Sequence, residues 1–313
     1  MPRRRRGQPV HGWVVLDKPS GLTSTQAVGR VRRLFDAEKA GHAGTLDPLA
    51  TGVLPIALGE ATKTVPYAMD AVKRYRFRVR WGEARDTDDA EGKVTETNAG
   101  RPDQAAILAA LPRFIGAISQ VPPAYSAIKV DGERAYDLAR EDVQVSLAPR
   151  MVQIEEFVLV GQPSGDAADF EVRSGKGTYM RALARDLARA LGTVGHVTAL
   201  RRLAVGAFDE SRAISLERLE ELGHSPALLE HLLPVETALD DIPALALAED
   251  EASRLRHGQP VSLLRRADRP RLDALLAAGD GPEVIACALA EGRPVAIVRL
   301  VEGALHPVRV LNL

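Results

Sequence analysis

One short stretch of the chain combines a carboxylate and an imidazole with several glycines. The run GHAGTLDPLATG, residues 41–52, holds His42 and Asp47 among small residues that would let a polynucleotide approach the backbone. Asp47 followed by Pro48 is also a common start of a helix, because Asp is a good N-cap and Pro is favoured in the first helical position. A cap explains neither His42 nor the apolar run after Gly52. We therefore expect Asp47 to be a catalytic carboxylate at the mouth of a sheet, with the helix cap as the alternative.

This run resembles the signature loop of the TruB family of tRNA pseudouridine synthases. The family pattern His-x-Gly-Thr-Leu-Asp-Pro-x-Ala-Thr-Gly is matched from His42 to Gly52. Further matches follow in the family's order: DKPSGLTS at 17–24, GEATK at 59–63, VPPAYSAIK at 121–129, GERAY at 132–136, GTYMR at 177–181 and LRRL at 200–203. Ala43 and the run Arg140-Glu141-Asp142 depart from the pattern, which concerns only local loop geometry. So many ordered motifs over roughly two hundred residues are very improbable by chance.

The resemblance implies an isomerase that converts the TΨC-loop uridine (U55) of tRNA to pseudouridine. This reaction breaks the bond from ribose to N1, turns the freed uracil and rejoins it through C5, so no atom is gained and no redox step occurs. We therefore expect no cofactor and no metal site. The sequence has no phosphate-binding glycine loop and no His-Glu-x-x-His motif.

The resemblance also implies roles for a catalytic pair. Asp47 would be the essential carboxylate, which either attacks the ribose or removes a ribose proton. Burial disfavours the charged form of a carboxylate, so such a group needs a cationic neighbour. Arg181 is the family's candidate for that cation. A phosphate contact or a solvated helix residue is the alternative for Arg181.

A uridine stacked inside RNA must be flipped out before it can reach such a pocket. By resemblance, Tyr75 is catalytic and stacks on the flipped uracil, although its sequence pattern alone would make it a core aromatic. Tyr179 would line the same pocket and Leu200 would form an apolar wall for the base. His42 would fill the space left in the RNA. Lys18 and Pro19 would support the loop that holds Asp47.

The charge distribution agrees with an RNA partner. The net charge is only -1, but residues 1–80 hold 15 Lys or Arg against 6 Asp or Glu, and residues 172–202 hold 7 against 1. Both basic regions contain the motifs, as expected if a polyanion lies over the active site. Basic faces that are merely solvated are the alternative. The resemblance implies that this partner is the T-arm stem-loop of tRNA, and we expect a monomer that needs no protein partner.

The composition indicates the compartment. Of the 313 residues, 45% are hydrophobic and 27% charged, which is ordinary for a globular domain. The single Cys287 allows no intrachain disulfide and is consistent with a reducing compartment. The basic residues Arg3 to Arg6 precede no apolar run, and no segment approaches the ~20 apolar residues of a membrane span. We therefore expect a cytoplasmic protein without membrane contact.

The periodicity of apolar residues predicts the secondary structure. Residues 13–17 are predicted to form a strand, and Ser24 to cap a helix with Val28, Val31 and Phe35 at helical spacing. Further strands are predicted at 74–81, 152–161, 169–174 and 197–205, and an arginine-rich helix at 178–191, closed by Gly192. In the strand at 74–81 apolar residues alternate with four arginines, giving one apolar and one basic face. The acidic stretch 82–92 is predicted to be a solvated loop. Strands and helices in irregular order favour an α+β fold.

The pattern changes near residues 240–246. We predict a catalytic domain over 1–244, with an inserted RNA-gripping flap over about 112–150, and a second domain over 245–313. The second domain is predicted to have one helix at 248–257 and short apolar runs at 284–289, 295–301 and 308–311, as in a small β-barrel. It resembles the family's PUA-like RNA-binding domain, and a purely structural cap is the alternative.

Two other functions fit the same motifs. The chain could be an RNA-binding or RNA-folding protein of this fold without turnover, or a member of the guide-RNA-dependent branch that works within a protein complex. Asp47, Tyr75 and Arg181 together favour the enzyme, because binding alone needs no buried carboxylate.

Overall fold

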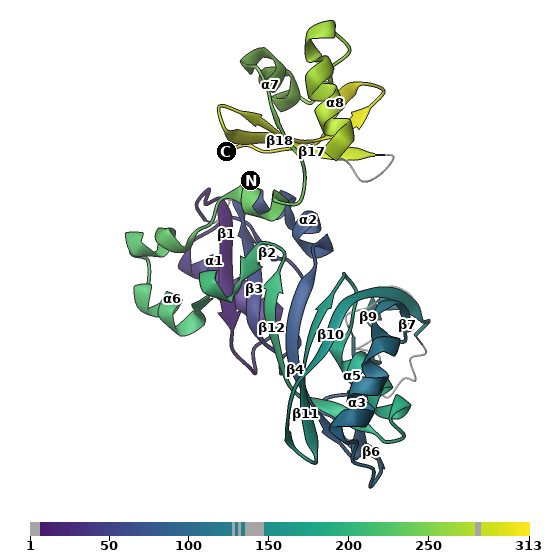
Figure 1. Cartoon of the computed structure of the whole chain (residues 1–313). Coiled ribbons are helices and arrows are strands. Elements are labelled where there is room, and N and C mark those ends of the chain that lie inside the picture. The colour runs from purple at the N-terminus through teal and green to yellow at the C-terminus, as the bar shows by residue number, and fades with distance from the viewer. Residues whose placement is uncertain (1–6, 127–128, 131–132, 135–146, 279–282) are drawn as a thin grey trace.

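The chain folds around two β-sheets, a large one in the N-terminal part and a smaller curled one at the C-terminal end (Figure 1). The computed structural model describes residues 7–126, 129–130, 133–134, 147–278 and 283–313. The mixed arrangement of strands and helices confirms the predicted α+β class. None of the described helices has the length and apolar composition that crossing a membrane would require.

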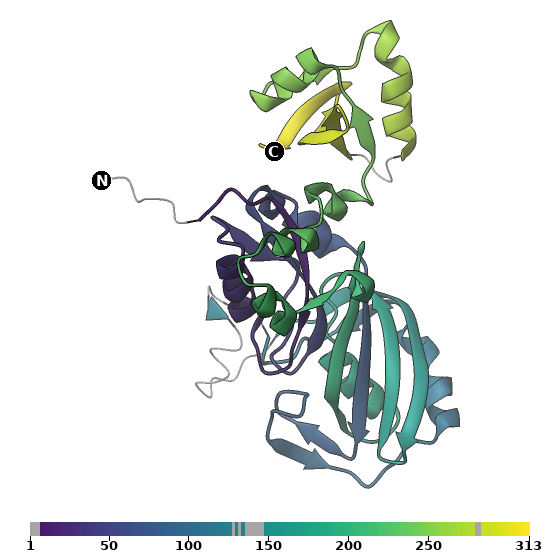
Figure 2. The ribbon, with the colours of Figure 1, turned by 90° about the vertical axis from the view of Figure 1, so that its left-hand side faces the viewer.

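The large sheet has ten strands, eight of them in the order β14-β1-β3-β12-β4-β11-β10-β7, while β13 pairs with β12 and β2 with β3. In chain order these strands are β1 (Gly12–Lys18), β2 (Ala40–His42), β3 (Thr51–Leu58), β4 (Lys73–Trp81), β7 (Gly116–Gln120), β10 (Arg150–Ser164), β11 (Ala167–Ser174), β12 (Gly195–Val205), β13 (Phe208–Asp209) and β14 (Ile214–Ser215). The pairs β1–β14 and β3–β12 are parallel and the others antiparallel. Figure 2 shows the long strands side by side.

Five α-helices accompany this sheet in the described residues. They are α1 (Ser24–Leu34), α2 (Val65–Asp70), α3 (Gln104–Ala110), α5 (Met180–Ala190) and α6 (Leu216–Leu222). Short 3-10 segments are η1 (Gly59–Lys63), η2 (Leu111–Phe114), η3 (Glu210–Arg212), η4 (Pro226–His231) and η5 (Val235–Leu239). The main core lies between the sheet and helices such as α1 and α5, and contains Val31, Phe77, Phe170 and Leu187.

Helix α1 begins as predicted, but with a different cap. Thr23 is the N-cap, and it exchanges hydrogen bonds with Gln26 in a capping box. Ser24 is the first helical residue, and its buried hydroxyl instead bonds both the backbone N–H and the carbonyl of Leu46. The prediction of Ser24 as the cap was therefore wrong, because this hydroxyl is used to tie the helix to the loop that contains Asp47.

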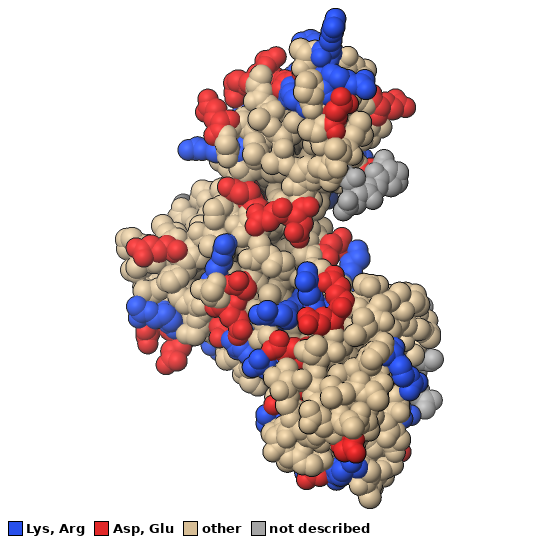
Figure 3. Space-filling model, viewed as in Figure 1, with Lys and Arg blue, Asp and Glu red and all other residues tan. Residues whose placement is uncertain are grey.

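Strand β4 shows the predicted alternation, with Phe77, Val79 and Trp81 buried and the arginines of the other face exposed. Two of those arginines have acidic partners on β11. Arg76 forms an ion pair with Glu171, and Arg78 binds both carboxylate oxygens of Asp169 at 2.6 and 2.8 Å. On the side shown in Figure 3, Lys and Arg likewise lie beside Asp and Glu over the middle of the molecule. The basic face of β4 is thus partly neutralised.

The acidic stretch 82–92 is not the solvated loop that its composition predicts. It begins with β5 (Glu83–Arg85), which forms a hairpin with β6 (Val94–Thr97). Between these strands Asp88 and Asp89 are buried, with exposed fractions of 9% and 4%. Their arginine partners come from α5, far along the chain.

The segment predicted as a flap, 112–150, starts at the edge of the large sheet. Its first residues complete η2, and β7 then pairs with β10 in antiparallel register. A two-stranded pair, β8 (Lys129–Val130) and β9 (Glu133–Arg134), follows. Residues 127–128, 131–132 and 135–146, which include several of the predicted flap residues, lie outside the described part, as do the arginines at 3–6.

The smaller sheet is built from the last seventy residues and has the order β15-β17-β18-β19-β16. Its elements are β15 (Ala244–Ala246), α7 (Glu249–Arg256), β16 (Val261–Ser262), η6 (Arg266–Asp268), α8 (Arg269–Ala278), β17 (Val284–Ala290), β18 (Arg293–Val301) and β19 (Ala304–Val310). Helix α8 was not predicted. The curled sheet has its own core and fits a PUA-like domain.

The end of the chain returns to the large sheet. Leu311 is buried in a cluster with Trp13 and Val53. Lys63 of η1 donates to the carbonyl of Val310 at 2.7 Å, and the backbone N–H of Asn312 donates to Glu60 at 2.8 Å. Burial alone would raise the pKa of Glu60, but the bonds from Asn312 and Lys63 hold it below its ordinary value.

Candidate active site

Asp47 lies in the loop between β2 and β3, residues 43–50, which we call the Asp47 loop. No helix follows Asp47, so the helix-cap alternative is wrong. Glycines allow the chain to enter and leave the loop, because Gly44 and Gly52 have φ of +94° and +98°. A Cβ on Gly52 would lie 2.2 Å from the carbonyl oxygen of Arg202. Gly52 is therefore required where β3 passes β12.

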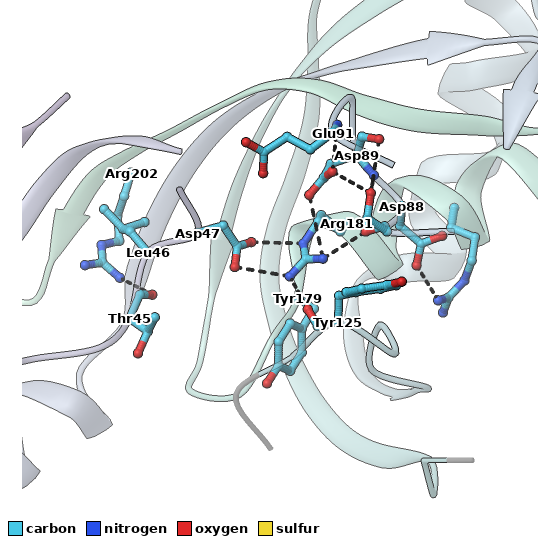
Figure 4. A network of polar contacts seen from close by, with 12 residues as sticks. Thr45, Leu46, Asp47, Asp88, Asp89, Glu91, Tyr125, Tyr179, Arg181 and Arg202 are labelled. Carbon is cyan, nitrogen blue, oxygen red and sulfur yellow. Dashed lines mark hydrogen bonds and ion pairs between the residues drawn. The ribbon is translucent and has the colours of Figure 1, made fainter. Parts of the chain in front are cut away.

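The Asp47 carboxylate points at the guanidinium of Arg181 (Figure 4). The distance from Oδ2 to Nε is 2.9 Å, and Nη2 donates to Oδ1 at 3.1 Å. The side chain of Arg181 is 5% exposed and that of Asp47 is 33% exposed. The cation is thus enclosed by protein, while the carboxylate remains accessible to a substrate.

Arg181 is held from several sides. It is the second residue of α5, where the helix dipole disfavours a cation. Nη1 donates to the carbonyl of Thr87 and Nη2 to that of Tyr125, both at 2.8 Å, and the Asp89 carboxylate lies 3.7 Å from Nη1. Two carboxylates and two carbonyls therefore compensate the burial of one guanidinium.

Asp88 and Asp89 are the residues of this site that the sequence analysis missed. Asp89 accepts hydrogen bonds from the Thr87 hydroxyl at 2.6 Å and the Glu91 N–H at 3.0 Å. Asp88 lies 2.8 Å from Arg185, one turn after Arg181 on α5, and burial raises the pKa of Asp88 despite this partner. Residues four apart lie on the same face of a helix, so Arg181 and Arg185 face the same way. This spacing could have predicted that the two arginines share a neighbouring acidic segment.

The Lys18 side chain lies beneath the Asp47 loop. It is fully buried, and Nζ donates to the carbonyls of Pro19 at 2.9 Å, Leu22 at 2.7 Å and Pro48 at 3.3 Å. Burial lowers the pKa of Lys18 to about 8, although Asp47 opposes this shift. Pro19 itself is exposed and contributes its carbonyl.

Tyr179 is the N-cap residue of α5, directly before the helix that contains Arg181. The buried side-chain amide of Gln120, at the end of β7, accepts a hydrogen bond from the Tyr179 N–H at 2.8 Å and donates one to the Tyr179 carbonyl at 3.2 Å. Burial raises the pKa of the Tyr179 phenol, and the nearby Asp47 charge adds to the shift. The structure therefore brings Tyr179 together with the Asp47–Arg181 pair.

The other predicted residues lie on three neighbouring strands. Tyr75 on β4 is half-buried and packs against the main core, which includes Leu200 on β12 and Leu46 of the Asp47 loop. His42 on β2 pairs in register with Ile56 of β3. Burial and the neighbouring Arg202 cation lower the pKa of His42, and its Nδ1 has no hydrogen-bond partner among the described residues.

Comparison with known proteins agrees with this fold. Residues 32–180 match the family model described as TruB family pseudouridylate synthase (N terminal domain), and residues 181–240 match the model described as tRNA pseudouridylate synthase B C-terminal domain. A protein of Rhodospirillum rubrum named tRNA pseudouridine synthase B is 58% identical over 313 residues, 100% of both chains. The protein of that name from Caulobacter vibrioides is 55% identical over 313 residues, again 100% of both chains.

Two solved structures resemble the fold at lower identity. A chain in a Cbf5-Nop10-Gar1 complex aligns with a TM-score of 0.71 and 23% identity, covering 96% of this chain and 85% of that one. A chain of an H/ACA RNP bound to a substrate RNA containing 2'-deoxyuridine aligns with a TM-score of 0.71 and 21% identity, covering 100% and 92%. At this identity the likeness concerns the fold alone.

The fold and the family models together define the class as a pseudouridylate synthase, which is an isomerase. Within that class, the chain belongs to the TruB family.

Proposed function

We propose that the protein converts the TΨC-loop uridine of tRNA, U55, to pseudouridine, with Asp47 as the essential carboxylate and the base flipped out of the RNA. The similarity to proteins named tRNA pseudouridine synthase B supports tRNA as the substrate class. The observation on which the site assignment depends is the partly exposed carboxylate of Asp47 against the buried guanidinium of Arg181.

The chemistry requires an ionised carboxylate next to the ribose. Arg181 lies on the protein side of Asp47 and places its positive charge against that carboxylate. An ionised Asp47 can attack the sugar carbon or remove a ribose proton, and in either route the uracil is freed from N1 and rejoined through C5. Because the guanidinium is already fixed by Thr87 and Tyr125, little reorganisation is needed as charge moves.

The surroundings suit a flipped uracil. Of the four residues on the apolar face of β4, Tyr75 alone is not fully buried, so part of its ring can stack on a base. The raised pKa of Tyr179 keeps its phenol protonated at neutral pH, and Leu200 supplies an apolar wall. The lowered pKa of His42 keeps its imidazole neutral, as suits a group that fills the space left in the RNA.

We propose that binding follows from several surfaces together. The segment that starts with β7 would grip the T-arm, and the C-terminal sheet would hold another part of the tRNA. We infer a monomer that needs neither a guide RNA nor a protein partner.

The direct test is Asp47→Asn, which removes the charge at nearly constant shape. We expect a folded protein that binds tRNA with unchanged affinity and forms no detectable pseudouridine in a single-turnover tritium-release assay with enzyme in excess. Asp36→Asn, at an exposed turn residue, is the matched control and should keep the full rate.

Each alternative gives a different result. Tight tRNA binding by the wild type without tritium release would favour an RNA-binding protein. Turnover that appears only with added guide RNA and proteins would favour the guide-dependent branch. Normal turnover by Asp47→Asn would remove the catalytic assignment.

A further inference from the structure

Arg202 on β12 is a fully buried arginine that has no acidic partner in the described part of the chain. Its exposed fraction is 1%, and among the described residues no carboxylate lies within ion-pair distance of its guanidinium. The neighbouring Arg201, by contrast, lies 3.0 Å from Asp17 and 2.6 Å from Glu210. A buried charge that lacks a counterion is costly, and a methionine would fill similar space without that cost. The charge therefore needs an explanation.

The guanidinium of Arg202 binds backbone carbonyls on both arms of the Asp47 loop. Nε donates to the carbonyl of Val53 at 2.8 Å, which follows the loop. Nη2 donates to the carbonyl of Gly44 at 3.0 Å, before Asp47. A longer contact of 3.5 Å joins Nη1 to the carbonyl of Thr45, also before Asp47 (Figure 4). A single planar group thus links the two arms, which the point charge of a lysine would do less well.

The remaining backbone next to Asp47 is also fixed, by other side chains. The Ser24 hydroxyl binds Leu46 through both its N–H and its carbonyl, and Lys18 binds the carbonyl of Pro48. These bonds tie the middle of the loop to α1 and β1. Backbone pairing of β3 with β12 fixes only the arm after the loop, whereas the Arg202 side chain, among the described residues, ties both arms to β12, the strand that also contains Leu200.

We propose that Arg202 is a positioning residue for Asp47, which fixes the arms of the loop so that the carboxylate meets the ribose in the reactive geometry. This inference rests on the proposed function, in which Asp47 is the catalytic carboxylate. Arg181 orients the side chain of Asp47, whereas Arg202 orients its backbone. A displacement of about 1 Å at a reacting group can cost around 100-fold in rate.

The test compares Arg202→Met with a matched control. Lys73 is a second buried cation that donates to backbone carbonyls, those of Met69 and Ala71 at the end of α2, and not to the Asp47 loop. Single-turnover rates with saturating enzyme, tRNA dissociation constants and melting temperatures are measured for both variants, below the melting temperature of each. We expect Arg202→Met to lose about 10- to 100-fold in rate with a dissociation constant within threefold of wild type. Lys73→Met should keep its rate within twofold.

Arg202→Lys keeps the positive charge and is the second test variant, which replaces Arg202→Met if that variant does not fold. We expect an intermediate rate and faster hydrogen exchange at the amides of Leu46 and Ala50, which Lys73→Met should leave unchanged. The proposal is overturned if Arg202→Met, or Arg202→Lys where only that variant folds, stays within threefold of the wild-type rate. It is also overturned if the rate of the Arg202 variant falls only by the factor by which its tRNA affinity falls. A rate loss of the same size in Lys73→Met would overturn it as well. Asp47→Asn is assayed in parallel, because its activity would refute the proposed function instead.

Discussion

Both carboxylate oxygens of Asp47 face the guanidinium of Arg181, with Oδ2 2.9 Å from Nε and Oδ1 3.1 Å from Nη2. The two groups differ in their surroundings, since Arg181 is enclosed and Asp47 is open on one side. The protein has therefore fixed the cation in advance and left the anion available. With the cation fixed in this way, little reorganisation is needed when the charge on the carboxylate changes during a reaction.

The two-atom contact predicts that lysine cannot replace Arg181. Arg181→Lys keeps the charge but loses the planar fork that reaches Asp47, Thr87 and Tyr125 together. We expect the single-turnover rate to fall by about 100-fold or more, with tRNA affinity little changed. Arg189→Lys, at an exposed position of the same helix, should match the wild type. A rate within threefold of wild type for Arg181→Lys would show that charge alone suffices.

The buried pair of Asp88 and Arg185 predicts measurable coupling. A double-mutant cycle with Asp88→Ala and Arg185→Met in denaturant unfolding should give a coupling energy of about 1–2 kcal/mol, because their side chains are only 12% and 19% exposed. The control cycle uses Arg218 and Glu221, whose side chains are 61% and 56% exposed. That pair should couple by about 0.5 kcal/mol or less. Equal coupling in the two cycles would contradict the structural role of Asp88.

Local patterns predicted the regular elements well. The alternation in β4 and the arginine-rich helix closed by Gly192, which is α5, depend on residues close in sequence, and both elements were confirmed. The α+β class followed from their order. The importance of Asp47 and Arg181 came from motifs, and their roles in catalysis remain predictions that the experiments above test.

The failures share a physical cause. Asp88 and Asp89 were placed in solvent because composition reports average exposure, whereas two arginines about a hundred residues later determine their burial. The expectation that Ser24 caps α1 failed because the partner of its hydroxyl, Leu46, lies 22 residues away in the sequence. The helix-cap interpretation of Asp47 failed for a similar reason, since the loop is held by distant Lys18 and Arg202.

The burial of Leu311 against the large sheet predicts that the end of the chain stabilises this sheet. Leu311→Ala should lower the free energy of unfolding by about 2–4 kcal/mol, because the side chain is 3% exposed and packs with Trp13 and Val53. Leu313→Ala is the control, since Leu313 is 54% exposed, and should change it by about 0.5 kcal/mol or less. Equal effects of the two substitutions in urea unfolding would show that Leu311 does not dock in solution.

The lowered pKa of Lys73 predicts how the free energy of unfolding depends on pH in the alkaline range. Burial lowers its pKa in the folded protein from 10.5 to about 8, whereas the unfolded chain keeps the ordinary value. Between these two values the unfolded chain binds a proton that the folded chain has released, so the free energy of unfolding rises with pH, by up to about 1.4 kcal/mol per pH unit for one such group. Lys73→Met removes this contribution. We therefore expect the variant to have a shallower rise, or a steeper fall, than the wild type from pH 8 to 10.5.

Urea unfolding at several pH values measures this difference directly. Other groups that titrate in the same range, including Lys18 and the tyrosines, are present in both proteins and cancel in the comparison. Lys93→Met, at an exposed lysine, should follow the wild-type curve. If the wild type and Lys73→Met give parallel curves, the ammonium group of Lys73 is not buried in solution as the structure shows.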